Sequence, residues 1–339
     1  METLIALADV RKSFGHTTAV DRLTLAVGRG EMMGVIGPDG AGKTTTLRMI
    51  CGLIAPDAGT VRVMGVDPFR VRRSATAAIG YLSQRFSLYG DLSIDENIAF
   101  FARIHGVWDF AARRDRLLDL TGLRPFRNRL AERLSGGMKQ KLALACTLVH
   151  EPPVLVLDEP TTGVDPVSRR EFWKLLAEFQ AQGLTMVMAT PYLDEAERCT
   201  RVALLHQGRL LAQDEPARLQ AQTEGVMVEI AVGEPREAMR VLREQLGDDR
   251  VQLFGDRLHV RLDQGQPVET AANVLIGAGV TVSGVREIAP TLEDVFIEQL
   301  GRAGSREDSE SSSAGARASG GGAPRAQEKD NRDGGARKA

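Results

Sequence analysis

Residues 37–44 read GPDGAGKT, and they fit the pattern G-x-x-x-x-G-K-[ST] of a phosphate-binding loop at every fixed position. The context fits as well, because the strand-like segment EMMGVI (31–36) precedes the loop and the helix-forming segment TTTLRMICGL (44–53) follows it. Such a glycine-rich turn lets successive backbone N–H groups and a helix N-terminus point at one phosphate. The stretch therefore predicts an α/β fold that binds a nucleotide after an early strand.

Two side chains supply further chemistry in this loop. Lys43 would bring a positive charge to the β- and γ-phosphates, and the hydroxyl of Thr44 would ligate Mg²⁺. The residues that we expect around the phosphates are Gly37, Asp39, Gly40, Ala41, Gly42, Lys43, Thr44 and Thr45.

Two carboxylates follow the apolar run Val154–Leu157 directly. Asp158 and Glu159 would therefore lie at the carboxyl edge of a buried parallel strand, which is where open α/β sheets bind their ligands. We expect Asp158 to hold Mg²⁺ through water, and Glu159 to orient or deprotonate an attacking water.

The first block of the chain, residues 1–222, alternates short apolar strands with helical patterns. This alternation predicts a mainly parallel sheet with helices on both faces. Between about residues 85 and 150 the strands disappear, and apolar residues recur at three- and four-residue spacing, as in an inserted helical subdomain. The strands and helices that we expect are Gly34–Ile36, Val154–Leu157, Thr185–Ala189 and Val202–Leu205, and Ile94–Ile104, Phe110–Thr121 and Lys139–Val149.

A second block, residues 223–301, has a different rhythm. Its segments follow the order β-α-β-β-α-β of a small ferredoxin-like α+β domain, with a short helix at TLEDVFIEQL (291–300). It contains no motif for catalysis or metal binding, so we expect a regulatory or structural role. Residues 302–339 contain no Leu, Ile, Val or aromatic residue, which predicts a disordered tail.

Global composition excludes several classes of protein. The 43 basic and 45 acidic side chains leave a formal net charge of −2, which argues against a nucleic-acid partner. The three cysteines are far apart and lack Cys-x-x-Cys spacing, so neither a disulfide framework nor a zinc site is expected. No apolar run is long enough to span a bilayer, and the start does not resemble a secretory signal. We expect a soluble chain of the cytoplasm.

A second anion-binding helix start occurs at residues 134–140, which read LSGGMKQ. Here the sequence resembles ATP-binding cassette (ABC) ATPases: LSGGMKQ matches their signature motif except that Met138 stands where Gln is usual. Phe14 stands where that family stacks an aromatic ring on adenine, Gln84 matches its Q-loop, and TGVD (162–165) matches its D-loop.

The resemblance implies that ATP is bound between two cassettes, each of which supplies a phosphate loop to one site and an LSGG segment to the other. It assigns ATP contacts to Phe14 and Gln84, and to Ser135, Gly136 and Gly137 across the dimer. Catalysis would fall to Glu159, Gln84 and Lys43. Mg²⁺ would be held by Thr44, Gln84 and Asp158. The partner could be a second copy of this chain, in a homodimer, or a different cassette, in a heterodimer.

Longer segments are most similar to the cassettes of type-2 ABC exporters, which include drug exporters, and above all to the first half of tandem-cassette ATPases. These segments are GPDGAGKTT (37–45), LSGGMKQKLALACTLV (134–149), GVDPVSRREFW (163–173), YLDEAERC (192–199) and PTLEDVFIEQLG (290–301). The resemblance implies a separate transmembrane permease, which docks in the cleft between the Q-loop and the helical subdomain. It also implies a peripheral position on the cytoplasmic face of the cell membrane.

Besides Met138, two further positions depart from the family pattern. Asp39 replaces an Asn, a neutral change if its side chain points outward. Pro191 stands where the family has a histidine that contacts the γ-phosphate, and proline offers neither a side-chain hydrogen bond nor a backbone N–H. Pro191 leaves open a regulatory cassette with little hydrolysis. A soluble ABC ATPase with no role in transport is a separate alternative.

Overall fold

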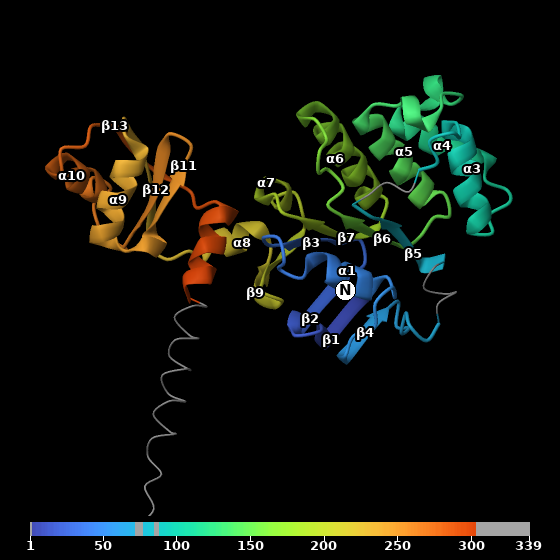
Figure 1. Cartoon of the computed structure of the whole chain (residues 1–339), viewed down its shortest axis with the longest axis horizontal. Coiled ribbons are helices and arrows are strands. Elements are labelled where there is room, and N and C mark those ends of the chain that lie inside the picture. Colours follow the sequence, from blue (N-terminus) through green and yellow to red (C-terminus); the bar gives the residue numbers. More distant parts are fainter. Residues whose placement is uncertain (1, 72–76, 85–87, 303–339) are drawn as a thin grey trace, which may run out of the picture. The chain divides into compact units, whose positions relative to one another are not determined.

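The computed structural model describes residues 2–71, 77–84 and 88–302 (Figure 1). The disordered tail expected at residues 302–339 lies outside this range except for Arg302. The described strands form three sheets, of six, three and four strands.

The six-stranded sheet confirms the expected parallel architecture. Its order is β5-β6-β7-β3-β8-β9, and β9 alone runs antiparallel, to β8. Because β3, β6 and β7 are buried along their whole length, their sequences are mainly apolar, and the polar residues of β6 and β7 stand only at the strand ends. The bounds are β3 Met32–Ile36, β5 Ile79–Leu82, β6 Val154–Asp158, β7 Thr185–Thr190, β8 Arg201–His206 and β9 Arg209–Asp214.

An antiparallel sheet of order β2-β1-β4 adds a layer that the sequence pattern did not predict. It consists of β1 Thr3–Phe14, β2 Thr17–Gly28 and β4 Ala58–Val63. Helix α1 (Lys43–Ile50) contacts β2 and β4 on one side and β6 and β7 on the other. Leu47 and Ile50 of α1 are buried in one apolar cluster with both sheets. The helix that follows the phosphate loop is thus fixed between two sheets.

Helices fill the chain between β5 and β6, as the apolar spacing predicts. They are α3 Ile94–Ile104, α4 Ala111–Thr121 and α5 Gly136–Leu148, with short 3₁₀ helices η1 Arg124–Phe126 and η2 Ala131–Arg133. Helix α3 begins with a capping box, in which Ser93 and Glu96 satisfy each other's backbone N–H groups. Helix α5 begins within the LSGGMKQ segment, as expected, and Ser135 caps it.

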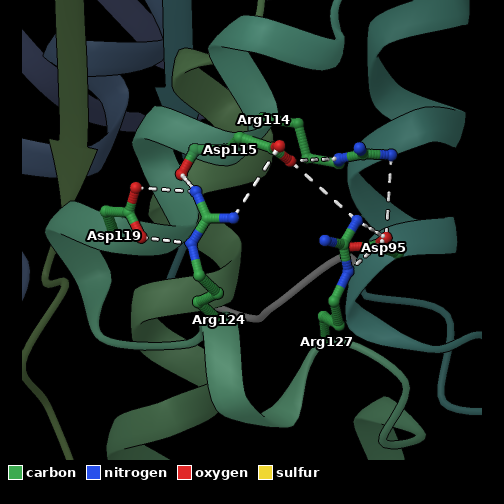
Figure 2. A network of polar contacts seen from close by, with 6 residues as sticks. All are labelled: Asp95, Arg114, Asp115, Asp119, Arg124 and Arg127. Atoms are coloured by element: carbon green, nitrogen blue, oxygen red, sulfur yellow. Dashed lines mark hydrogen bonds and ion pairs between the residues drawn. The ribbon is translucent and has the colours of Figure 1, made fainter.

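A network of ion pairs joins three parts of this helical region (Figure 2). Arg127, after η1, donates from Nε to Asp95 of α3 at 2.9 Å, and Arg114 of α4 lies 3.6 Å from the same carboxylate. The network fixes the segment that leads to η2 and α5 against α3. Its members are Asp95, Arg114, Asp115, Asp119, Arg124 and Arg127.

Helix α6 (Pro166–Ala181) joins the face of the parallel sheet that carries the helical region. Phe172 and Leu176 of α6 are buried in one cluster with Leu155 of β6 and Met186 of β7. Two shorter helices follow, α7 Leu193–Ala196 after β7 and α8 Pro216–Ala221 after β9.

The C-terminal block has the predicted β-α-β-β-α-β order and its own buried core. Its antiparallel sheet has the order β11-β12-β10-β13, and a further helix covers residues 292–302. Among the described residues, no helix combines the length and apolar character needed to cross a bilayer. The bounds are β10 Val226–Val232, α9 Pro235–Leu246, η3 Asp248–Arg250, β11 Val251–Phe254, β12 Arg257–Leu262, α10 Thr270–Gly277 and β13 Val282–Ile288.

Candidate functional site

The phosphate loop connects β3 to α1 and passes close to two neighbouring strands. Gly42 has a φ of +97°, and a Cβ there would lie 2.3 Å from the carbonyl oxygen of Ala19 in β2. At Gly37 a Cβ would lie 2.1 Å from the carbonyl oxygen of Leu205 in β8. Only glycine fits at either position, which is the physical reason for this spacing in the sequence.

Lys43 is buried, with 5% of its surface exposed, and its ammonium group lies inside the loop. Nζ donates to the carbonyl oxygens of Gly37 at 2.8 Å and Pro38 at 3.1 Å. It lies 3.8 Å from the carboxylate of Glu159 and 4.0 Å from that of Asp39. The Asp39 side chain is fully exposed on the outside of the loop, at the limit of ion-pair distance from Lys43.

Thr44 and Asp158 meet at the carboxyl end of β6. The Thr44 hydroxyl donates to one carboxylate oxygen of Asp158 at 3.0 Å, and the Tyr81 hydroxyl donates to the other at 3.2 Å. Burial and the neighbouring Asp158 carboxylate raise the pKa of Tyr81 to about 12, so its hydroxyl keeps its proton. Hydroxyl and carboxylate oxygens are ligands that Mg²⁺ prefers, and this cation is often held by one carboxylate plus substrate phosphates. The donor set therefore fits the expected magnesium ion.

Glu159 and Gln84 come together from two adjacent strands. Gln84, just after β5, donates from Nε2 to the carboxylate of Glu159 at 3.0 Å. The Thr162 hydroxyl donates to the same oxygen at 3.3 Å. With Lys43 on its other side, the Glu159 carboxylate is held at the mouth of the phosphate loop by three polar groups.

The backbone of Glu159 has a φ of +48°, in the left-handed region that non-glycine residues seldom adopt. Such a conformation costs roughly 1–3 kcal/mol and persists only where surrounding contacts hold it. The Glu159 N–H donates to the carbonyl oxygen of Ala189 in β7 at 2.9 Å. This bond ties the strained residue to the neighbouring strand.

Pro191 lies directly after Thr190, the last residue of β7. Because Asp158 pairs with Ala189, Pro191 follows β7 at the edge of the sheet that carries Asp158 and Glu159. Neither its ring nor its backbone nitrogen can donate a hydrogen bond there.

Phe14 ends β1 and is half exposed, at 51% of its surface. Lys12 Nζ lies 5.5 Å from the centre of its ring. Phe14 pairs with Thr17 at the start of β2, the strand whose Ala19 carbonyl contacts the phosphate loop. The ring is therefore presented to solvent on the hairpin that packs against the loop.

The LSGG segment begins α5. The Ser135 hydroxyl accepts from the N–H of Met138 at 3.3 Å, and both Ser135 and Gly136 are exposed. At Gly137 a Cβ would lie 2.2 Å from the hydroxyl oxygen of Ser168 in α6, so only glycine fits. Within the described part of the chain, the hydrogen bond of the Ser135 hydroxyl stays inside α5 and does not reach the phosphate loop of the same chain.

Two features of the site escaped sequence reasoning. One is Tyr81, which supports Asp158 from β5. The other is Glu195 of α7, which is 1% exposed and accepts hydrogen bonds from Thr161 and Thr190. For Tyr81, the sequence offers only its place in a strand, three residues before Gln84. The role of Glu195 depends on contacts across the fold, which the spacing of a motif does not predict.

The sequence matches one protein-family model and several known proteins. A family model described as ABC transporter matches residues 20–162. The probable multidrug ABC transporter ATP-binding protein YbhF of Escherichia coli (strain K12) is 40% identical over 314 residues, which are 90% of this chain and 54% of that protein. The chain thus spans about half the length of that relative. The Nod factor export ATP-binding protein I of Paraburkholderia xenovorans (strain LB400) is 37% identical over 307 residues, 89% of this chain and 98% of that protein.

Solved structures agree on the fold. An ATP-binding subunit of an ABC transporter matches with a TM-score of 0.59 and 29% identity, over 65% of this chain and 93% of that one. The dimeric bacterial ABC transporter cassette MJ0796 matches with a TM-score of 0.55 and 26% identity, over 62% of this chain and 98% of that one.

Proposed function

The chain belongs to the ABC transporter family, and from this membership we propose that it is the ATP-hydrolysing subunit that energises export through a separate transmembrane permease. The observation that carries the proposal is the convergence of Lys43, Asp158, Glu159 and Gln84 at one edge of the parallel sheet. Relatives named for multidrug transport and for Nod factor export support the direction of transport.

The residues divide the reaction between them. The loop N–H groups and Lys43 would bind the phosphates of ATP, and Lys43 would meet the charge that develops as the γ-phosphoryl group leaves. Glu159 would accept a hydrogen bond from the attacking water and align it, while Gln84 and Thr162 hold the carboxylate.

Mg²⁺ fits the oxygen donors of Thr44 and Asp158, and Gln84, just after the adjacent strand β5, would add a third donor. When bound, the cation neutralises phosphate charge. Tyr81 would keep the Asp158 carboxylate oriented for this role, because its hydroxyl retains its proton at neutral pH.

A second cassette completes the site in this proposal. The exposed N-terminus of α5 is a place where backbone N–H groups and Ser135 can meet a phosphate from another chain. One structural relative is described as dimeric, and the same cassette has been seen with ADP and phosphate after hydrolysis. We propose that Ser135, Gly136 and Gly137 contact ATP held by the partner's phosphate loop.

The permease would dock beside the Q-loop. A cavity of about 210 Å³ opens between the end of α1 and α3, lined by Leu53, Phe101 and His105 among others. Leu53, which lines this cavity, and Ile104, which precedes the lining residue His105, are exposed apolar side chains, with 60% and 62% of their surfaces accessible. Exposed apolar side chains that gather around a cavity are typical of a protein interface. We propose a type-2 permease as the partner, which would place the chain at the cytoplasmic face of the membrane.

The two alternatives to an exporter ATPase are not favoured by the comparisons. The relatives are named as transporter or export proteins rather than as nucleic-acid-binding ATPases. Pro191 would then affect the rate of ATP hydrolysis and not the function of the chain.

The test is ATP hydrolysis by the purified full-length chain, alone and with its permease in vesicles. We expect hydrolysis that requires Mg²⁺ and that Glu159→Gln reduces to background while ATP still binds. Full activity in Glu159→Gln, or hydrolysis stimulated by nucleic acid instead of by the permease, would contradict the proposal.

A further inference from the structure

Glu195 is a carboxylate buried beside the candidate active site, although no step assigned above uses it. It lies in α7 and is 1% exposed. Its two oxygens have different donors: the Thr161 hydroxyl donates to Oε1, and the Thr190 hydroxyl donates to Oε2 at 2.9 Å. Arg169 of α6 lies 3.5 Å from Oε1. Every partner that a buried carboxylate needs is therefore supplied.

The two threonines belong to the two chain segments that hold the backbone of Glu159. Thr161 follows Glu159 by two residues, and its carbonyl oxygen accepts from the N–H of Val164 in the turn that leads to α6. Thr190 follows Ala189, whose carbonyl oxygen accepts the Glu159 N–H at 2.9 Å. The Glu195 carboxylate thus completes a closed loop of covalent and hydrogen-bonded links, here called the circuit. It runs through Glu159, Thr161, Glu195, Thr190 and Ala189.

This circuit surrounds a residue in an unfavourable conformation. The φ of +48° at Glu159 requires neighbours that fix the chain on both sides, because a non-glycine residue relaxes out of the left-handed region when it is free. The hydrogen bond to Ala189 fixes the N-terminal side. The bond from Thr161 to Glu195 fixes the C-terminal side to the same strand, β7.

We propose that Glu195 is a positioning residue for ATP hydrolysis, which clamps the segment after β6 to the end of β7 and so keeps the Glu159 carboxylate aimed at the phosphate loop. The inference rests on the role proposed for Glu159. Within the described part of the chain, the hydrogen bonds and the ion pair of the Glu195 side chain go to Thr161, Thr190 and Arg169 and not to residues 37–44, so the clamp acts on the rate of hydrolysis and leaves ATP binding alone.

The experiment compares Thr161→Val, Thr161→Ser and Glu195→Gln with the wild-type full-length chain. We expect Thr161→Val and Glu195→Gln to lower kcat about tenfold or more, since small displacements of a reacting group have large effects on rate. The dissociation constant for ATP, measured by titration with a fluorescent analogue, stays within about twofold of wild type because the phosphate loop is untouched. Thr161→Ser keeps the hydroxyl and restores most of the turnover.

Thr121→Val is the matched control. Thr121 is also a buried threonine, at 3% exposure, and its hydroxyl donates to the carbonyl oxygen of Leu117 at 2.7 Å within α4. This variant loses one buried hydrogen bond, as Thr161→Val does, and we expect its thermal midpoint to fall while its kcat stays at the wild-type value.

Three results would overturn the clamp: unchanged kcat in Thr161→Val, equal loss of kcat in Thr121→Val, or a parallel loss of ATP affinity. Where Glu195→Gln fails to fold, the pair Thr161→Val and Thr161→Ser decides the matter. Glu159→Gln separates the two proposals. If it hydrolyses ATP like the wild type, the role of Glu159 is wrong; if it is inactive while Thr161→Val is fully active, the clamp alone is wrong.

Discussion

Among the side chains of the site, Lys43 has the role that a single substitution can test most directly. Its ammonium group is enclosed by the carbonyl oxygens of Gly37 and Pro38, and it is the nearest cation to the Glu159 carboxylate among the ion pairs of the described residues. Side-chain length and loop geometry together put one positive charge where phosphates bind.

Lys43→Ala is expected to weaken ATP binding by at least about tenfold, because charge-assisted contacts to the phosphates are lost. Titration with a fluorescent ATP analogue measures the effect. Lys141→Ala is the control, since Lys141 pairs with Glu171 at 2.6 Å on the surface of α5. Affinity that is unchanged in Lys43→Ala would show that the loop does not bind phosphate.

His150 makes stability depend on pH. Its ring stacks on that of His105, with 3.7 Å between the centroids, and burial lowers the pKa of His150 from 6.5 to about 4. The unfolded chain therefore takes up this proton at a higher pH than the folded protein does. The buried, neutral His150 ring therefore contributes fully to the free energy of unfolding above pH 6.5. This contribution is lost as the pH falls from 6.5 towards 4.

His150→Phe is expected to lose less stability than the wild type over the same pH range, because the phenyl ring stacks without titrating. Urea unfolding at neutral pH and at several acidic values gives the free energies to compare. Parallel pH profiles for the two proteins would show that His150 is not the titrating group.

At this scale, motif spacing predicted the residues whose roles depend on local chain geometry. Lys43 and Thr44 are fixed by the loop itself, and Asp158 and Glu159 by the end of a strand. Tyr81 and Glu195 were not predicted, because their roles arise from contacts across the fold, 77 residues apart for Tyr81 and Asp158. A single sequence does not record such pairs.

Among the elements, the helices of residues 94–148 depend on polar contacts as well as on apolar packing. Asp95 occupies the first turn of α3, where a carboxylate also favours the helix dipole, and it accepts from Arg127. Figure 2 shows Asp95 between Arg114 and Arg127, on the opposite side of the network from Asp119.

Asp95→Asn is expected to lower the free energy of unfolding by about 1 kcal/mol, since it removes the charge from half-buried hydrogen bonds. Urea unfolding measures the loss. Asp119→Asn is the matched control in the same network, and it should cost less because Asp119 is more exposed, at 59% against 21% for Asp95. An equal loss in both variants would contradict the argument.

The spacing of apolar residues predicted the helices and buried strands well, because in each of these elements it reflects which residues are buried. Helix α3 matches its expected bounds, and β6 and β7 each extend one residue beyond theirs. The antiparallel sheet of β1, β2 and β4 was not predicted. Several of its strand residues are exposed, so apolar and polar positions mix, and bulges interrupt the register of β1 with β2.

For the whole molecule, the chemistry is divided between two surfaces of the chain. The phosphate loop, Asp158 and Glu159 form one half of the proposed site, and the exposed start of α5 with Ser135 and Gly136 forms the other. Within the described residues, the hydrogen bond of the Ser135 hydroxyl lies inside α5 and does not join the two halves. A closed two-fold dimer would bring each half onto its counterpart and generate two equivalent sites.

This division predicts complementation between two inactive variants. In a dimer of Lys43→Ala with Ser135→Arg chains, one site carries both defects, while the other combines an intact phosphate loop with an intact LSGG segment. We expect each variant alone to be inactive, and an equal mixture to recover about a quarter of the wild-type ATPase activity, because random pairing makes half of the dimers mixed, with one working site each. A mixture of Glu159→Gln with Ser135→Arg should recover activity in the same way, whereas a mixture of Glu159→Gln with Lys43→Ala should stay inactive, because both changes lie in the phosphate-loop half and no site is intact. No recovery in the mixture of Lys43→Ala and Ser135→Arg would contradict the homodimer and require a different cassette as the partner.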